Sequence, residues 1–345
     1  MSFIILLLDW YRTNKRPLPW RWDKNAFKVW MSEIILQQTR VNQGLNYYHK
    51  FLNNFSNIHE LASADENLVL NLWQGLGYYT RARNLHKTAK IISQDYDGEF
   101  PKDYNELKKL PGIGPYTAAA IASICFDQKV PAIDGNAYRV YSRLFGLDKD
   151  ISHSNAHKFF FDFAKNIMPN KNTGDFNEAI MELGATICLP KIPLCTNCPI
   201  SKDCIAYQTG KVDKFPIKTK KVKIKKRYFH YFFVQNEKSG EFLIKKRKEK
   251  DVWYNLFDFP IIETKSKELL QYPFAEENPL KISEVKHALT HQHLNIKFYE
   301  VICSMESFKE LKKEYLNIHP QQIKDTPFPQ PIASFLASRF PEMVQ

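Results

Sequence analysis

Apolar residues recur with helical spacing over the larger, N-terminal part of the chain. Their i, i+3, i+4 pattern predicts one helix around residues 27–36 and another around 47–55. Five more segments have the length of ordinary globular helices and are separated by glycine and proline: 62–72, 81–95, 116–126, 136–145 and 155–167. No alternating strand pattern interrupts them. We therefore expect an all-helical domain over residues 1–210.

The pattern changes after Gly210. Residues 211–227 hold eight lysines, one arginine and a single acid, which predicts an extended linker that is either a solvated spacer or a strap along a phosphate backbone. Aromatic and β-branched residues then predict strands at 228–234, 241–246 and 294–303, followed by a short helix at 308–315. Residues 228–345 are expected to form a second, α+β domain.

Composition narrows the class of protein. The chain has 345 residues, 44% of them hydrophobic, which suits two globular domains and excludes a disordered chain. Its longest apolar run, residues 3–8, is far shorter than the roughly 20 residues that cross a bilayer. It also lacks the flanks of a secretory signal, so we expect a soluble, cytoplasmic protein. The net charge of +12 favours a polyanionic partner, with nucleic acid ahead of a membrane.

Four of the six cysteines lie within seventeen residues, at Cys188, Cys195, Cys198 and Cys204. In a chain without an export signal, such a cluster points to a metal site. Four thiolates can hold either tetrahedral zinc or an iron-sulfur cluster. Zinc ribbons usually supply two close pairs of cysteines, and this chain has one pair. The spacing therefore favours iron-sulfur but leaves zinc open.

Residues 110–116 (Leu-Pro-Gly-Ile-Gly-Pro-Tyr) lie between two predicted helices. Gly112 and Gly114 allow a tight turn whose amides, with those of the following helix, could hold a phosphate. The alternative is an ordinary turn between helices.

Two carboxyl groups are candidates for chemistry. Glu33 interrupts an apolar helix, where burial would raise its pKa and suit a general acid, unless it faces solvent beside Trp30. Asp134 precedes the helix predicted from Asn136. It is either only a helix cap, or a carboxylate held ionised by the helix N-terminus and facing a cleft. One neutral and one ionised carboxyl is the usual division of labour for breaking a glycosidic bond.

Together these motifs resemble one superfamily. Glu33, the 110–116 hairpin, Asp134 and the four cysteines occur in this order in helix-hairpin-helix base-excision DNA glycosylases, the group of endonuclease III and the MutY-type adenine glycosylases. The similarity covers nearly the whole chain. It implies a multidomain fold, with an all-α glycosylase domain and a 4Fe-4S cluster on the loop 188–204.

Within the superfamily, Tyr116 is informative. Endonuclease III-like enzymes have a lysine nucleophile at this place, and without an amine no Schiff base forms. The strings at 16–21, 30–33, 36–39, 75–79, 134–136 and 176–184 are similar to the MutY-type branch. That branch appends a Nudix-like domain, and residues 246–260 resemble its start. The glutamate-rich Nudix catalytic box is missing, so this domain is expected to recognise a base rather than hydrolyse diphosphates.

The resemblance implies a monofunctional enzyme that flips adenine out of duplex DNA, where it is paired with 8-oxoguanine, and cuts its glycosidic bond. By similarity, Glu33 protonates the adenine, Asp134 stabilises the sugar cation, and Tyr116 and Asn136 orient Asp134 and the reacting sugar. The adenine pocket would consist of Arg16, Trp20, Arg21, Leu36 and Glu178. Gln38 and Tyr78 would fill the gap in the stack, and Thr39, Thr290 and His291 would face the 8-oxoguanine.

One departure and two alternatives accompany this hypothesis. The family's lesion loop often reads Phe-Ser-His, whereas this chain has Leu289-Thr290-His291. The nearest alternative is a bifunctional endonuclease III-like enzyme for oxidised pyrimidines. The other is a non-catalytic iron-sulfur protein that only binds lesions. We expect a monomer whose partner is double-stranded DNA, with no membrane partner.

Overall fold

The computed structural model describes residues 2–220, 224–269, 274 and 279–343. By its contacts the chain divides into two units, Met1–Ser63 with Asn84–Lys220, and Ala64–Arg83 with Lys221–Gln345. Residues 64–83 join the second unit through bonds such as Asn71 Nδ2 to the Lys324 carbonyl, at 3.1 Å. The predicted domain boundaries at 210 and 228 stay a prediction, and Lys221, Val222 and Lys223 of the predicted linker lie outside the described residues.

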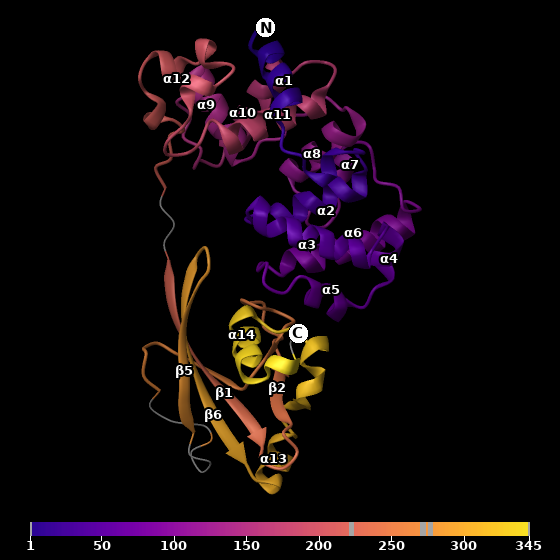
Figure 1. Cartoon of the computed structure of the whole chain (residues 1–345), viewed down its shortest axis with the longest axis vertical. Coiled ribbons are helices and arrows are strands. Elements are labelled where there is room, and N and C mark those ends of the chain that lie inside the picture. The colour runs from indigo at the N-terminus through magenta and orange to yellow at the C-terminus, as the bar shows by residue number, and fades with distance from the viewer. Residues whose placement is uncertain (1, 221–223, 270–273, 275–278, 344–345) are drawn as a thin grey trace. The chain divides into compact units, whose positions relative to one another are not determined.

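The N-terminal 220 residues are helical wherever they form regular structure in the described part of the chain (Figure 1). The α-helices up to that point are α1 (Ser2–Asn14), α2 (Ala26–Leu36), α3 (Val41–Asn54), α4 (Ile58–Ser63), α5 (Glu66–Leu72), α6 (Thr80–Asp95), α7 (Tyr104–Leu107), α8 (Pro115–Phe126), α9 (Gly135–Phe145), α10 (Ala156–Ile167), α11 (Thr173–Thr186) and α12 (Ile205–Gln208). Short 3-10 turns lie at Pro19–Arg21, Cys195–Asn197, Ser201–Asp203 and Val212–Lys214. The all-helical prediction is confirmed.

Two details of that prediction are wrong. The helix expected at 62–72 is divided into α4 and α5, because the Asp65 side chain accepts the Asn67 amide at 2.7 Å and starts a new helix. The apolar run at 3–8 lies in helix α1, which the sequence pattern did not predict; Leu7 and Leu8 face the core, whereas Ile5 and Leu6 are exposed. Among the described residues, every helix is too short or too polar to span a bilayer.

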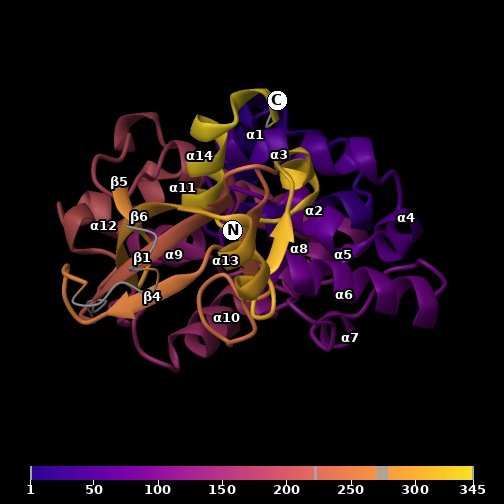
Figure 2. The ribbon, with the colours of Figure 1, turned by 90° about the horizontal axis from the view of Figure 1, so that it is seen from below.

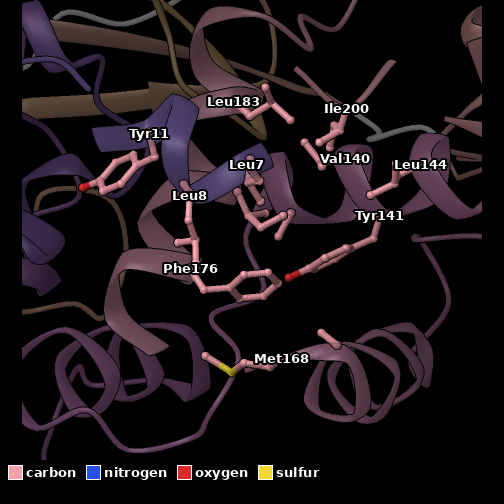
Figure 3. Packing of buried hydrophobic residues seen from close by; sticks show 14 of the residues in the cluster. Leu7, Leu8, Tyr11, Val140, Tyr141, Leu144, Met168, Phe176, Leu183 and Ile200 are labelled. Carbon is pink, nitrogen blue, oxygen red and sulfur yellow. The ribbon is translucent and has the colours of Figure 1, made fainter. Parts of the chain in front are cut away.

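A buried cluster joins α1, α9, α10 and α11 in the first unit (Figure 3). The cluster contains Leu7 and Tyr11 of α1, Tyr141 of α9 and Phe176 of α11, and all four are fully buried. Ile200 reaches the same cluster from the cysteine-rich loop, and three of the four cysteines pack against its edge. Packing of this core therefore fixes the loop beside α9.

Helix α8 is apolar on all sides and is buried from Thr117 to Ile124. Helix α11 approaches it closely, because Gly174 has no side chain at the crossing. An added Cβ there would lie 2.6 Å from the Ile124 Cα and 2.7 Å from the Ser123 carbonyl oxygen. Near the other end of α11, a Cβ on Gly184 would lie 2.5 Å from the Asn136 Cβ. Two glycines thus let α11 lie against α8 and against the start of α9.

The second unit contains a mixed sheet. Its described strands are β1 (Lys225–Asn236), β2 (Phe242–Lys246), β3 (Phe257–Asp258), β4 (Ile261–Thr264), β5 (Leu280–Ala288), β6 (Gln292–Cys303) and β7 (Leu316–Ile318). The order is β3-β2-β1-β6-β5, with β4 also paired to β1 and β7 to β2. β1 runs parallel to β6 and antiparallel to β4, on its other edge (Figure 2).

Helices complete this unit. They are α13 (Met305–Leu311) and α14 (Gln330–Arg339), with 3-10 turns at Pro320–Asp325 and Pro341–Met343. Phe335 of α14 stacks on Phe298 of the sheet, with ring centroids 4.6 Å apart. The three expected strands are confirmed, and the first is longer, since it starts at Lys225. The helix expected at 308–315 instead covers Met305–Leu311, because Ser304 caps it through the Ser307 amide at 3.2 Å.

The close approach of α11 to α8 is testable by Gly174→Ala. We expect this variant to lose about 1–3 kcal/mol of unfolding free energy, because the new methyl group meets backbone atoms that cannot rotate away. Urea denaturation measures the loss. Gly135→Ala is the matched control, since its Cβ would meet nothing within 4 Å at the start of α9. Equal stability of the two variants would contradict this packing.

Candidate active site

A single cleft in the first unit brings most of the predicted site residues together. It has a volume of about 1080 Å³ and lies between α2, α8, α9 and α11 and the segment that follows α1. The predicted residues that line it are Arg16, Trp20, Arg21, Glu33, Leu36, Gln38, Thr39, Gly112, Gly114, Tyr116, Asp134, Asn136 and Glu178. Tyr78, Thr290, His291 and the four cysteines lie elsewhere.

Asp134 is both a helix cap and a cleft residue. Its Oδ1 accepts the Ala137 amide of α9 at 2.7 Å, and its Oδ2 accepts the Asn136 side-chain amide at 2.8 Å. Burial raises the pKa of Asp134, although these two donors and Arg139 oppose the shift. Asp134 thus caps α9 and also faces the cleft, and that the helix N-terminus keeps its carboxyl ionised stays a prediction.

Asn136 is held in place by Arg139. Its Oδ1 accepts Arg139 Nη2 at 2.7 Å, and the same guanidinium donates to the carbonyls of Gly184 and Cys188, each at 2.6 Å. Arg139 is a buried residue of α9, four positions from Arg143. A continuous set of hydrogen bonds therefore connects the Cys188 carbonyl with the Asp134 carboxyl.

Glu33 comes from the last turns of α2 and lines the cleft, so the solvent-facing alternative is wrong. Burial raises the pKa of Glu33 to about 7. A hydrogen bond with Tyr116 and the charge of Arg21 lower this pKa, and the nearby carboxyls of Asp134 and Glu178 raise it further. This carboxyl is thus half protonated near neutral pH, which is where a general acid is most useful.

A buried ion network forms another part of the cleft wall. Arg16 binds Glu182 through Nε at 2.7 Å and Nη2 at 2.8 Å, and Arg21 bridges Glu178 at 3.0 Å and Glu182 at 2.9 Å. Burial raises the pKa of Glu178, which has one arginine partner. Burial also acts on Glu182, but two arginines outweigh it and lower that pKa. The network fixes the segment after α1 onto α11.

The hairpin and the end of α2 form the rim. Gly112 has a φ of 75°, and a Cβ there would lie 2.7 Å from the Asn84 Cβ, so this turn needs glycine. Gly114 caps α8 without a side chain, which leaves the first amides of α8 open to an anion. Gln38 has a φ of 58° and an exposed side chain. That strained turn directs the chain along the rim.

The four predicted cysteines line one small cavity with Arg143. All four are free thiols, and burial raises the pKa of Cys198 to about 12. Arg143 Nη1 lies 3.4 Å from Cys188 Sγ and 2.7 Å from the Leu189 carbonyl, while its Nε binds the Phe215 carbonyl at 3.1 Å. In the described part of the chain, no three His, Cys, Asp or Glu side chains form a ready-made site for a single metal ion.

The remaining predicted residues line a separate pocket of about 430 Å³ in the second unit. The hydroxyl groups of Tyr78 and Thr290 share a hydrogen bond there, and His291 is a further lining residue. Trp253 and Tyr254 supply aromatic walls. Tyr78 therefore lies with Thr290 and His291, whereas its predicted partner Gln38 lines the cleft of the first unit.

Sequence reasoning did not single out several residues that hold the site. These are Arg139, Arg143, Met181 and Glu182. Met181 and Glu182 follow Glu178 by three and four positions, so helical spacing could have placed them on the same face of α11. The partners of the two arginines are distant in sequence, and no local signal indicates them.

Comparisons with known proteins show the family of the chain. Residues 31–165 match the model of the HhH-GPD superfamily of base excision DNA repair proteins, and residues 230–338 match the model of the NUDIX domain. The adenine DNA glycosylase of Buchnera aphidicola subsp. Schizaphis graminum is 38% identical over 347 residues, covering 97% of each chain. The human adenine DNA glycosylase is 41% identical over 211 residues, which are 59% of this chain and 39% of the human one.

Solved structures share the helical fold. A thermostable thymine-DNA glycosylase superimposes with a TM-score of 0.55 at 28% identity, covering 60% of this chain and 96% of that one. Endonuclease III trapped as a covalent intermediate with DNA gives a TM-score of 0.52 at 22% identity, covering 60% and 94%. At 22% identity, the likeness to endonuclease III concerns the fold alone.

The raised pKa of Glu33 predicts a pH-dependent cost in stability. The folded state holds a proton that the unfolded state releases between about pH 4.5 and 7, so stability falls as the pH rises through that window. We expect Glu33→Gln to be more stable than the parent at pH 8, on the order of 3 kcal/mol. The difference should close below about pH 4.5. Urea unfolding across this range measures it.

Glu310→Gln is the control for that measurement, because Glu310 is exposed and pairs with exposed Lys313. It should show no gain of comparable size at pH 8. A Glu33→Gln variant whose stability follows the parent at every pH would contradict the burial of this carboxyl.

Proposed function

The chain belongs to the adenine DNA glycosylases of the HhH-GPD superfamily, and from that premise we propose a monofunctional base-excision enzyme that removes adenine paired with 8-oxoguanine or guanine. The observation that carries the proposal is the pair of carboxyls in one cleft. Glu33 titrates near neutral pH, and Asp134 is presented at the start of α9. By the resemblance, Tyr116 would occupy the place where a lyase of this superfamily has its lysine.

Adenine leaves as an anion unless it receives a proton, so the first task of the site is protonation. Glu33 donates its proton to N7 of the flipped base as the bond from N9 to the sugar C1′ breaks. Adenine then departs as a neutral molecule. Water adds to C1′ and returns a proton to the Glu33 carboxylate, which restores the acid.

Asp134 stabilises the positive charge that develops on the sugar. Because both of its oxygens already accept hydrogen bonds from Ala137 and Asn136, the carboxylate is oriented before the substrate binds. It stabilises the oxocarbenium-like sugar by its charge or by transient covalent capture. Asn136 and Tyr116 act as orienting residues.

The walls of the cleft suit a purine. Trp20 and Leu36 offer apolar surface, while Arg16, Arg21 and Glu178 supply hydrogen-bonding groups around it. The turn at Gln38, with Tyr78, would fill the space left in the duplex when the base leaves the stack. Amides at Gly112, Gly114 and the start of α8 would hold a backbone phosphate.

The lesion on the opposite strand would be recognised by Thr39 and by the pocket of Thr290 and His291. Thr290 keeps a hydroxyl that can bond to the edge of a modified base, and Tyr78 already bonds to it. The neighbouring Leu289 supplies apolar contact in place of an aromatic ring. Residues 230–338, which match the NUDIX domain, would therefore help to recognise the lesion.

The four cysteines fit a 4Fe-4S cluster as its ligands. Their thiols line one cavity beside a buried arginine, whose positive charge favours an anionic group of thiolates. A cluster of four irons is larger than one ion, so its ligands need not form a single-ion site. When bound, the cluster would supply a covalent cross-link across residues 188–204. We further propose that the enzyme is a monomer acting on chromosomal DNA in the cytoplasm.

The proposed reaction is tested under single-turnover conditions with a duplex that carries adenine opposite 8-oxoguanine. Strand breaks should appear only after alkali treatment. Glu33→Gln should slow base release by about 10²–10⁴-fold, because the proton donor is lost, while binding to the duplex is retained. Glu310→Gln should react like the parent. Breaks without alkali would indicate a lyase, and tight binding without base release in the parent protein would indicate a lesion reader.

The cluster assignment is tested by Cys198→Ser, with iron and sulfide content and visible absorption as readouts. The variant should purify with much less iron, because one thiolate ligand is lost. Cys303→Ser is the control, since Cys303 is buried in the second unit and should leave the iron content unchanged. If a purified parent protein carries one zinc and no sulfide, the iron-sulfur assignment is wrong.

A further inference from the structure

Met181 offers a hydrogen-bond acceptor to the Tyr116 hydroxyl group. It lies on α11 between Glu178 and Glu182, and its side chain lines the cleft. The Tyr116 hydroxyl oxygen lies 3.2 Å from Met181 Sδ, so the sulfur is within reach of its hydrogen. A thioether is a weak acceptor, and an apolar side chain would be an ordinary choice for this place.

The Tyr116 hydroxyl has one hydrogen and two neighbours that can accept it. One is Met181 Sδ, and the other is the Glu33 carboxyl, which also bonds to Tyr116. If the hydrogen is directed to Glu33, it favours the ionised carboxylate. If it is directed to Met181, the tyrosine oxygen is free to accept a hydrogen bond from a protonated Glu33. The sulfur therefore decides which form of the acid Tyr116 supports.

We propose that Met181 is a positioning residue: it accepts the Tyr116 hydrogen and so leaves Glu33 able to keep its proton until the flipped base takes it. This inference rests on the proposed function and adds a residue to it. The step involves no change in covalent bonds, since the tyrosine hydrogen only turns between two acceptors. Met181 acts through Tyr116 and does not itself touch the reacting atoms.

The charges of other groups near Glu33 also shift its pKa. Asp134 and Glu178 favour the protonated acid through their charge, and Arg21 opposes it. The Arg21 guanidinium is already engaged by Glu178 and Glu182 on α11. Rotation about the C–O bond of Tyr116 can reverse the effect of its hydroxyl group on the Glu33 pKa. Met181 Sδ, the second acceptor, therefore influences that pKa.

The test is the pH dependence of single-turnover adenine release by Met181→Leu. Leucine has nearly the same volume but no acceptor, so the hydrogen of Tyr116 turns to Glu33 and stabilises the ionised form. The rate should then fall at lower pH than in the parent. The basic limb is the part of the pH–rate profile where the rate falls as the pH rises. We expect its midpoint to move down by about half a pH unit, the effect of one weak hydrogen bond.

Two further variants make the result specific. Met168→Leu is the matched control, because Met168 is buried in the core away from the cleft, and its basic limb should stay in place. In a Tyr116→Phe background, Met181→Leu should no longer move the limb, since the hydroxyl is gone.

An unchanged limb in Met181→Leu would overturn the inference and leave the proposed function intact. An equal shift in Met168→Leu, or a shift that persists without the tyrosine hydroxyl, would also overturn it. A parent protein that releases no adenine at any pH would instead refute the proposed function itself.

Discussion

Removal of carboxyl groups from water is the constraint on which the rest of the site depends. Four acids line the cleft, and each has a different set of donors. Glu182 has two arginines and its pKa is lowered, while Glu178 has one and its pKa is raised. Asp134 has helix and side-chain amides, and Glu33 has mainly Tyr116. Burial raises the pKa of three of these acids, whereas the two arginines outweigh burial and lower the pKa of Glu182.

Helix α9 connects this chemistry with the cysteine loop. Asp134 caps its first turn, Arg139 holds Asn136 from the second, and Arg143 binds the loop from the third. The approach of α11 depends on Gly184, which allows contact with Asn136. One short helix therefore orients the carboxylate and anchors the segment that carries the four thiols.

Much of this arrangement could be predicted from local pattern. Helical spacing located most helices of the first unit, and the order of Glu33, the hairpin and Asp134 indicated one site that the cleft does unite. Strand β5 was not predicted, because its side chains are mostly exposed and do not alternate clearly. Contacts such as Arg139 with Cys188 join residues 49 positions apart, and local spacing carries no information about them. The upward shift of the Asp134 pKa results from burial, and burial is known only once the chain has been folded.

Central to the mechanism is that burial in the cleft raises the pKa of Glu33 to about 7, so that this carboxyl titrates near neutral pH. The most direct test follows the side-chain carbon resonances of protein labelled with ¹³C-glutamate during a pH titration, with Glu33→Gln used to assign the signal. The account predicts that this carboxyl titrates at about pH 7. A midpoint near 4.5, the ordinary value for glutamate, would contradict it.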